Sequence, residues 1–130
     1  MFAVTQTVIE KLRAAGVTLA MLFGSRATGR AKPASDWDLG IIGGNPAGRD
    51  LLQAELEQVL GSRVDLIDLR RAPPLLAMAV VREGKVLVDS TGSEFAQFAS
   101  LSLRRYEDTR KLRKAQDESL KVFLAQRGLR

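Results

Sequence analysis

The sequence predicts one α/β or α+β domain, a small mixed sheet of about four strands with helices mainly on one face and a long C-terminal helix. Short apolar runs bounded by glycine, proline or aspartate alternate with amphipathic helical segments, as expected for a sheet covered by helices. The chain has 130 residues and is 45% hydrophobic, enough for one domain with a buried core. We divide it into a core over residues 1–92 and an amphipathic helix over residues 93–130, which either belongs to the same domain or serves as a docking element.

The order of the elements follows from caps, glycines and apolar periodicity. A capping box at Thr7, or an equally good start at Thr5, begins a helix that ends before Gly16. A buried strand over residues 17–23 follows, because this short run is largely apolar and glycine ends it. The next expected elements are a short helix over residues 25–31, a strand over 36–42, a helix over 50–60, a strand over 63–69, a helix over 73–83 and a short strand over 85–89.

The C-terminal helix, over residues 94–126, is amphipathic and outruns the predicted sheet, being about 50 Å long. Its apolar stripe must pack against another chain, or the helix must bend or break near Asp108 and Thr109; an ordinary packed helix pair is the simpler alternative. Residues 94–130 carry 9 Lys and Arg against 5 Asp and Glu, whereas residues 1–93 carry 11 against 10. This basic face is either solvated or a docking surface for an acidic partner or nucleic acid.

The composition excludes several classes of chemistry. The chain has no cysteine and no histidine, which rules out disulfides, zinc sites built on those side chains and Ser-His-Asp triads. The N-terminus lacks the features of a signal peptide, and the longest apolar runs, about seven residues, are too short to span a membrane. We therefore expect a cytoplasmic protein whose chemistry depends on carboxylates, hydroxyls, Lys, Arg and metal ions.

A Gly-Ser pair, Gly24 and Ser25, follows the first predicted strand and opens the short helix. Glycine permits a tight turn and the close approach of an anion to the backbone. Serine adds a hydroxyl and an N–H group at a helix start, where unpaired N–H donors favour phosphate. Alone this pair is an ordinary turn, but its distance from the next motif suggests a phosphate site.

The next motif is an acidic pair, Asp36 and Asp38, which opens the second predicted strand. Residues two apart on a strand point to the same face, so the two carboxylates would repel each other unless cations lie between them. Ligation by oxygen alone suits Mg²⁺ or Mn²⁺. A third acid on the next strand, Asp65 or Asp68, would complete a two-metal site. Asp65 and Asp68 are three residues apart and therefore point to opposite faces of the strand. The apolar pattern does not choose between them, because both faces of that strand are apolar.

Together these motifs resemble the signature of the DNA polymerase β-like nucleotidyltransferase superfamily, in which Asp-x-Asp follows Gly-Ser after about ten residues. The stretch is most similar to the minimal nucleotidyltransferase (MNT) branch, and the resemblance covers residues 5–90. It implies the nucleotidyltransferase fold, and it favours Asp65, because the third acid of small members lies early in a Val-Asp-Leu-type strand. The sequence departs from the pattern of this superfamily at two positions: Trp37, where an aliphatic residue is more usual, and Thr28, where many members carry a second arginine.

The chemistry that these residues suggest is two-metal nucleotidyl transfer. Gly24 and Ser25 would bind the β- and γ-phosphates of a nucleoside triphosphate, while Arg26 and Arg30, with Lys32, would neutralise its charge. The acids would hold two Mg²⁺ ions, or Mn²⁺, and help to activate a hydroxyl that attacks the α-phosphorus as pyrophosphate leaves. The expected catalytic and metal-binding set is Asp36, Asp38 and Asp65.

Within the MNT branch, the chain resembles antitoxins encoded beside HEPN-domain partners, which are helical ribonuclease toxins. The resemblance implies a protein adenylyltransferase that moves AMP from ATP to a tyrosine hydroxyl of such a toxin. The alternatives are transfer to a small molecule such as an aminoglycoside, and a non-catalytic module that neutralises its partner by complex formation. The C-terminal helix would dock the partner or join copies in a homo-oligomer. We expect neither membrane association nor direct nucleic-acid binding.

Overall fold

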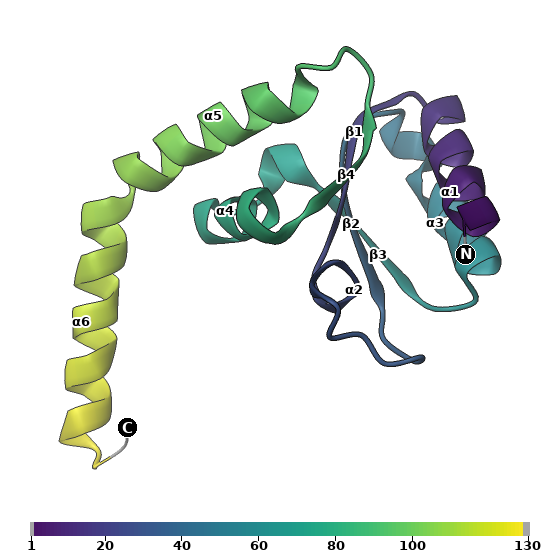
Figure 1. The fold of residues 1–130 in the computed structure, drawn as a ribbon. Coiled ribbons are helices and arrows are strands. Elements are labelled where there is room, and N and C mark those ends of the chain that lie inside the picture. Colours follow the sequence, from purple (N-terminus) through teal and green to yellow (C-terminus); the bar gives the residue numbers. More distant parts are fainter. Residues whose placement is uncertain (1, 129–130) are drawn as a thin grey trace.

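The computed structural model describes residues 2–128, with side chains from residue 5 onward, and its centre is a mixed four-stranded sheet in the order β3-β2-β1-β4 (Figure 1). Strand β1 pairs antiparallel with β2 and β4, and β2 pairs parallel with β3. In chain order the elements are α1 (Phe2–Ala14), β1 (Val17–Phe23), α2 (Ser25–Thr28), β2 (Trp37–Gly43), the 3-10 turn η1 (Pro46–Gly48), α3 (Arg49–Leu60), β3 (Val64–Asp68), the 3-10 turn η2 (Leu69–Arg71), α4 (Pro74–Glu83), β4 (Lys85–Asp89), α5 (Glu94–Asp108) and α6 (Arg110–Gln126).

The fold class predicted from the sequence is confirmed, but the helices are distributed differently from the expectation that they lie mainly on one face. Helices α1 and α3 cover one face of the sheet, and α4 and α5 cover the other (Figure 1). The reason lies in β1, whose apolar side chains alternate between the two layers. Ala20 and Leu22 belong to the core under α1 and α3, and Leu19, Met21 and Phe23 to the core under α4 and α5. A strand that is apolar on both sides needs cover on both sides.

Most predicted elements appear close to their expected bounds, and two differ for local reasons. Helix α1 already includes Phe2, ahead of both candidate caps. Helix α2 is one turn long and ends at Thr28 rather than at residue 31, because Gly29 adopts the left-handed conformation with φ 78°. The Gly29 N–H donates to the Ser25 carbonyl oxygen, which closes the turn.

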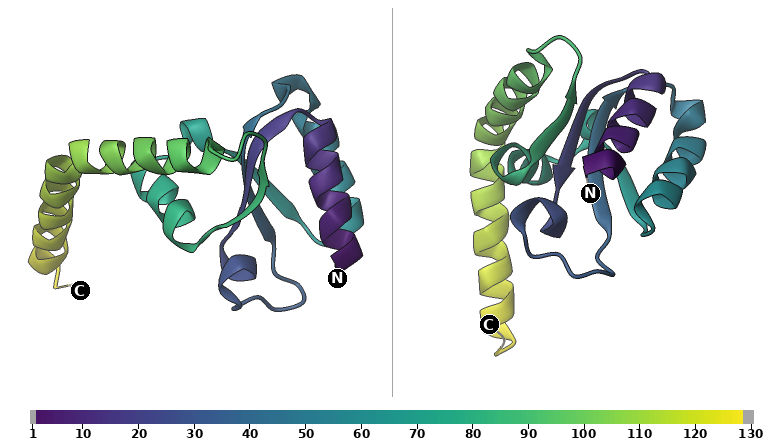
Figure 2. Two further views of the ribbon diagram at one scale, coloured as in Figure 1. Left: turned by 45° about the horizontal axis from the view of Figure 1, so that its top comes forward. Right: turned by 45° about the vertical axis from the view of Figure 1, so that its right-hand side comes forward.

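The C-terminal helix bends at Thr109, one of the alternatives left open by the sequence, so that α5 and α6 run in different directions (Figure 2). The Thr109 hydroxyl donates to the carbonyl oxygens of Arg105 and Tyr106 at 3.0 and 3.2 Å. The Arg113 guanidinium lies 3.5 Å from the centre of the Tyr106 ring and donates to the Thr109 hydroxyl. These contacts hold the angle between the two helices. Among residues 2–128, no helix is both long and apolar enough to cross a membrane.

The start of α5 depends on Asp89, the last residue of β4. Its carboxylate accepts hydrogen bonds from the backbone N–H groups of Gly92, Glu94 and Phe95. The Phe95 bond is the main cause that lowers the pKa of Asp89 below its ordinary value of 3.8. A carboxylate with a lowered pKa stabilises the fold while it is ionised, and this contribution is lost as the pH falls below 3.8 and through the lowered pKa.

We therefore expect Asp89→Ala to lower the melting temperature at pH 7 by a few degrees, the scale expected for a lost helix cap. Thermal melts followed by circular dichroism from pH 7 to pH 2 would check this, and the gap from wild type should narrow at the acid end. Asp117→Ala is the matched control, because it removes the same charge from an exposed position on α6. Equal melting temperatures of Asp89→Ala and wild type at pH 7 would show that the cap contributes nothing.

Candidate active site

The Gly-Ser turn lies directly against Asp38, the acid on strand β2. Gly24 has φ 73° and ψ −157°, a conformation that other residues rarely adopt, and a Cβ atom there would lie 2.3 Å from Asp38 Oδ2. The antiparallel register places Phe23, the residue before Gly24, opposite Asp38. Ser25 begins α2, and the first N–H groups of a helix have no acceptor within it. Backbone donors and a carboxylate therefore meet at the C-terminal end of β1.

Two more acids lie beside Asp38. The parallel register of β2 and β3 places Asp65 directly opposite Asp38, so both residues lie on the sheet face that α4 and α5 cover. Asp36 is exposed and immediately precedes β2. Burial raises the pKa of Asp38 above its ordinary value of 3.8, and the negative charges of Asp65 and then Asp36 raise it further. The structure thus brings the three predicted acids into one electrostatic site.

The side-chain atoms that this site offers to a metal ion are carboxylate oxygens only, which suits Mg²⁺ or Mn²⁺. A bound cation would relieve the repulsion that raises the pKa of Asp38. Within the described residues, no three acidic side chains lie close enough to hold one ion as they stand. Asp65 Oδ1 is instead 3.6 Å from the Arg63 guanidinium, and its side chain is half-exposed. The strand register sets the Asp65 and Asp38 backbones side by side, so an ion shared by the two acids would require the Asp65 carboxylate to turn away from Arg63.

Asp68, the other candidate for the third acid, lies on the opposite face of the sheet. It pairs in register with Ile41, which belongs to the core under α1 and α3. Its carboxylate accepts the Arg70 N–H at 3.0 Å and lies 3.5 Å from the Arg49 guanidinium. Asp68 therefore closes the η2 turn and anchors the start of α3, while Asp65 is the acid that lies beside Asp38.

The basic residues of the motif differ in their surroundings. Arg30 and Lys32 have exposed side chains that remain available to an anion. Arg26 is half-buried, donates to two backbone carbonyl oxygens and stacks on Trp37. Trp37 points away from the acids and packs against the core under α1 and α3. The Arg26 contacts have no signal in the sequence, because they depend on how the loop folds back. The Arg63 partner of Asp65 is local, since residues two apart on a strand share a face.

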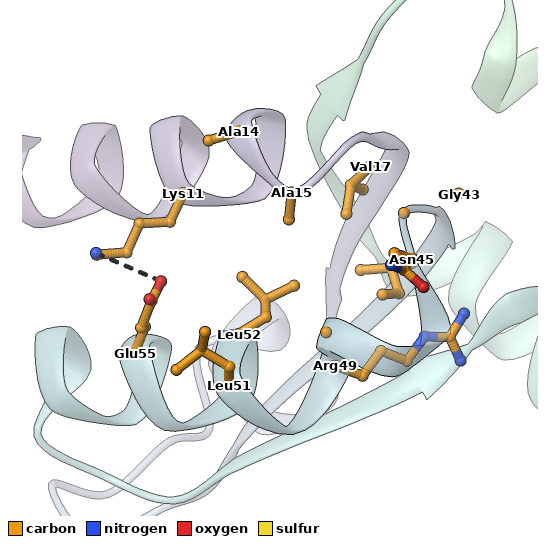
Figure 3. A pocket seen from close by; sticks show the side chains of 13 residues that line it. Lys11, Ala14, Ala15, Val17, Gly43, Asn45, Arg49, Leu51, Leu52 and Glu55 are labelled. Atoms are coloured by element: carbon orange, nitrogen blue, oxygen red, sulfur yellow. Dashed lines mark ion pairs between the residues drawn. The ribbon is translucent and has the colours of Figure 1, made fainter.

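A pocket of about 470 Å³ lies elsewhere, between the facing sides of α1 and α3 (Figure 3). The Gly43-Gly44 turn closes one end, and an ion pair of 3.7 Å joins Lys11 and Glu55 across the gap between the helices (Figure 3). Its lining includes Ile41, at the far end of β2 from Asp38 and on the opposite face of the sheet. This pocket is therefore separate from the three acids, none of which lines it.

Comparison with known proteins assigns the arrangement to a family. The family model described as polymerase beta, nucleotidyltransferase matches residues 6–92, a segment that contains the Gly-Ser turn and all three acids. This chain belongs to that nucleotidyltransferase family. The resemblance noted from the sequence motifs is confirmed, and the strands that carry them are those of the family domain.

Individual relatives are similar over most of their length. The protein adenylyltransferase MntA of Aphanizomenon flos-aquae (strain 2012/KM1/D3) is 30% identical over 122 residues, which cover 84% of this nucleotidyltransferase and 81% of the relative. A toxin–antitoxin crystal structure with AMP-PNP is 29% identical at a TM-score of 0.80 and covers 90% of this chain and 98% of its own. A chain in the solved structure of a tri-AMPylated Shewanella oneidensis HEPN toxin in complex with MNT antitoxin is 27% identical at a TM-score of 0.76. The match covers 92% of this chain and 98% of that one.

The raised pKa of Asp38 makes a prediction about stability. An acid with a raised pKa favours the folded state while it is protonated, so this contribution is complete below pH 3.8 and is lost as the pH rises through the raised pKa. We expect Asp38→Asn to melt at a higher temperature than wild type at pH 7 without divalent cations, and the gap to close near pH 3. Thermal melts in EDTA across this range would check it.

Asp68→Asn is the control for this prediction, because Asp68 is likewise an aspartate on a strand of the sheet, but its carboxylate has favourable partners. It should melt at a lower temperature than wild type at pH 7. The idea of a repulsive acid cluster is wrong if Asp38→Asn is destabilised as Asp68→Asn is.

Proposed function

We propose that this nucleotidyltransferase is a Mg²⁺-dependent protein adenylyltransferase that moves AMP from ATP to a hydroxyl of a partner protein, as the antitoxin of a HEPN toxin. The observation that carries the proposal is the meeting of the Gly24 backbone, Asp38 and Asp65 at one edge of the sheet. Support comes from a relative named as a protein adenylyltransferase, and from similar structures that contain AMP-PNP or an AMPylated HEPN toxin. The cytoplasm, which holds ATP, is the compartment that fits this activity.

Each residue of the site has a role in this reaction. The N–H groups of the Gly24-Ser25 turn bind phosphate oxygens, and the exposed Arg30 offsets charge on the triphosphate. Asp36, Asp38 and Asp65 would hold Mg²⁺, or Mn²⁺, which neutralises the triphosphate and lowers the pKa of the acceptor hydroxyl.

The covalent step needs no histidine. The acceptor oxygen attacks the α-phosphorus of ATP, a new P–O bond forms, and the bond to pyrophosphate breaks. The Asp65 carboxylate, half-exposed at the rim of the site, takes the hydroxyl proton. The products are the AMP ester of the acceptor and pyrophosphate.

The surroundings of the acids suit a large acceptor. Asp36 is exposed, and Asp65 lies on β3, an edge strand of the sheet. Helix α6 buries none of its side chains and extends toward the same end of the molecule as α2 (Figures 1 and 2). Its exposed apolar residues offer a surface that this domain does not cover: Leu112, Leu120, Val122 and Phe123. We assign α6 to partner docking, with homo-oligomerisation as the alternative.

The proposal predicts different results for the two acids of β3. Asp65→Asn should lower transfer of labelled AMP from Mg-ATP to a HEPN toxin by at least about a hundredfold, as expected for loss of a metal-holding and proton-accepting group. Asp68→Asn should transfer at nearly the wild-type rate below its melting temperature, because Asp68 faces α3. Label incorporation followed by gel electrophoresis measures both. The reverse ranking would exclude Asp65, and no transfer by wild type to any protein would refute the function.

Removal of residues 109–130 tests the docking role. The remaining domain should keep its melting temperature and its binding of Mg-ATP, because α6 contributes no buried residue. It should no longer form a complex with the toxin, measured by size-exclusion chromatography with light scattering. The full-length variant Phe123→Asp keeps α6 but places a charge on its apolar surface, and it should also weaken the complex with the toxin. An unfolded product would show that α6 supports the core, and an unchanged complex would place docking elsewhere.

A further inference from the structure

The segment between α2 and β2 carries Asp36 back to the Gly-Ser turn, and little regular structure holds it. Its backbone bonds include Arg30 N–H to the Ser25 carbonyl at 3.0 Å and Ser35 N–H to the Lys32 carbonyl at 2.9 Å. The segment is largely exposed. A loop of this kind is mobile unless a side chain ties it to the domain. The position of Asp36 therefore depends on such a tie.

Arg26 supplies this tie. Its Nη2 atom donates to the carbonyl oxygens of Pro33 and Ser35 at 3.1 and 2.8 Å. Its guanidinium carbon lies 4.5 Å from the centre of the Trp37 ring. One side chain, attached next to Ser25, thus contacts the residues on both sides of Asp36.

Part of the contact is buried: the Pro33 hydrogen bond is exposed, and the Ser35 hydrogen bond is partly buried. The Nε atom of Arg26 and the Nε1 atom of Trp37 are both buried, and in the described part of the chain neither has a hydrogen-bond partner. Charge-assisted hydrogen bonds and a cation–π contact strengthen when water is excluded. The guanidinium charge is therefore occupied by the loop and the indole ring rather than facing a ligand.

We infer that Arg26 is a positioning residue that holds the loop carrying Asp36, and so sets Asp36 beside Asp38, rather than a group that neutralises the triphosphate. This inference rests on the proposed function for its catalytic consequence, while the contact itself is independent of that function. Asp38 is fixed by strand pairing on both sides, whereas Asp36 lies outside the strand, between the two residues that Arg26 contacts. Arg26 therefore acts on the reaction through the position of Asp36.

Arg26→Lys separates the two roles, because lysine keeps the charge but lacks the planar group that reaches two carbonyls and stacks on a ring. A positioning role predicts a fall in kcat of roughly tenfold to a hundredfold, the cost of a small misplacement of catalytic groups. The KM for ATP should change little, because the Gly24 and Ser25 amides remain in place. Neutralisation of the triphosphate predicts the opposite, a nearly unchanged kcat for a variant that keeps its charge.

Trp37 is the only tryptophan of the chain and reports on the contact directly. Arg26→Lys should change the emission maximum or intensity of Trp37 in the absence of nucleotide. Arg13→Lys is the matched control, since Arg13 is exposed on α1 and its variant should keep wild-type emission, kcat and KM. Arg26→Met, which removes the donors but keeps the side-chain stem, should change emission and kcat in the same direction as Arg26→Lys. Circular dichroism melts set an assay temperature at which every variant is folded.

The outcomes distinguish this inference from the proposed function. Lower kcat, similar KM and altered Trp37 emission in Arg26→Lys support the positioning role. Wild-type emission and kcat in that variant overturn it, and so does a raised KM with unchanged kcat. If wild type transfers no AMP, the function fails by itself. Trp37 emission, which needs no turnover, then still decides whether Arg26 holds the loop: altered emission in Arg26→Lys supports the contact, and wild-type emission overturns it.

Discussion

The close approach between the Gly24 backbone and the Asp38 carboxylate is the constraint on which the rest of the site depends. A side chain at Gly24 would occupy the space of Asp38 Oδ2, so the turn and the acid can only be neighbours if that residue is glycine. The antiparallel pairing of β1 with β2 sets this contact, and the parallel pairing of β2 with β3 adds Asp65. A slip of either strand by one residue would turn its acid to the opposite face.

The sheet separates support from chemistry. The face under α1 and α3 is an apolar core that receives Trp37 from the middle of the acidic motif. The opposite face, under α4 and α5, is apolar over most of its area and becomes acidic where β2 and β3 begin. Burial of Asp38, followed by the charges of Asp65 and Asp36, raises the pKa of Asp38, so its ionised carboxylate opposes folding. The two apolar layers supply the stability that allows such a cluster to persist.

Much of this arrangement could be predicted from the sequence, because strands, caps and the acidic spacing are local signals. The length of the C-terminal helix indicated either a break near Thr109 or packing against another chain, and the fold shows the break. The choice between Asp65 and Asp68 was not decided by the apolar pattern, because β3 is apolar on both faces; its register with β2 separates them. The contacts of Arg26 with loop carbonyls depend on a chain path that no periodicity encodes.

Helix α6 has a further consequence, which concerns the lifetime of the protein. Because it buries no side chain in its own domain, its unfolding does not require the core to open. An isolated helix of this length is only marginally stable in water. A protease that needs an unfolded segment can therefore begin cleavage at α6 while the rest of the molecule is folded. Cover of α6 by another protein would remove that starting point, so the rate at which the chain is degraded would report whether it is bound.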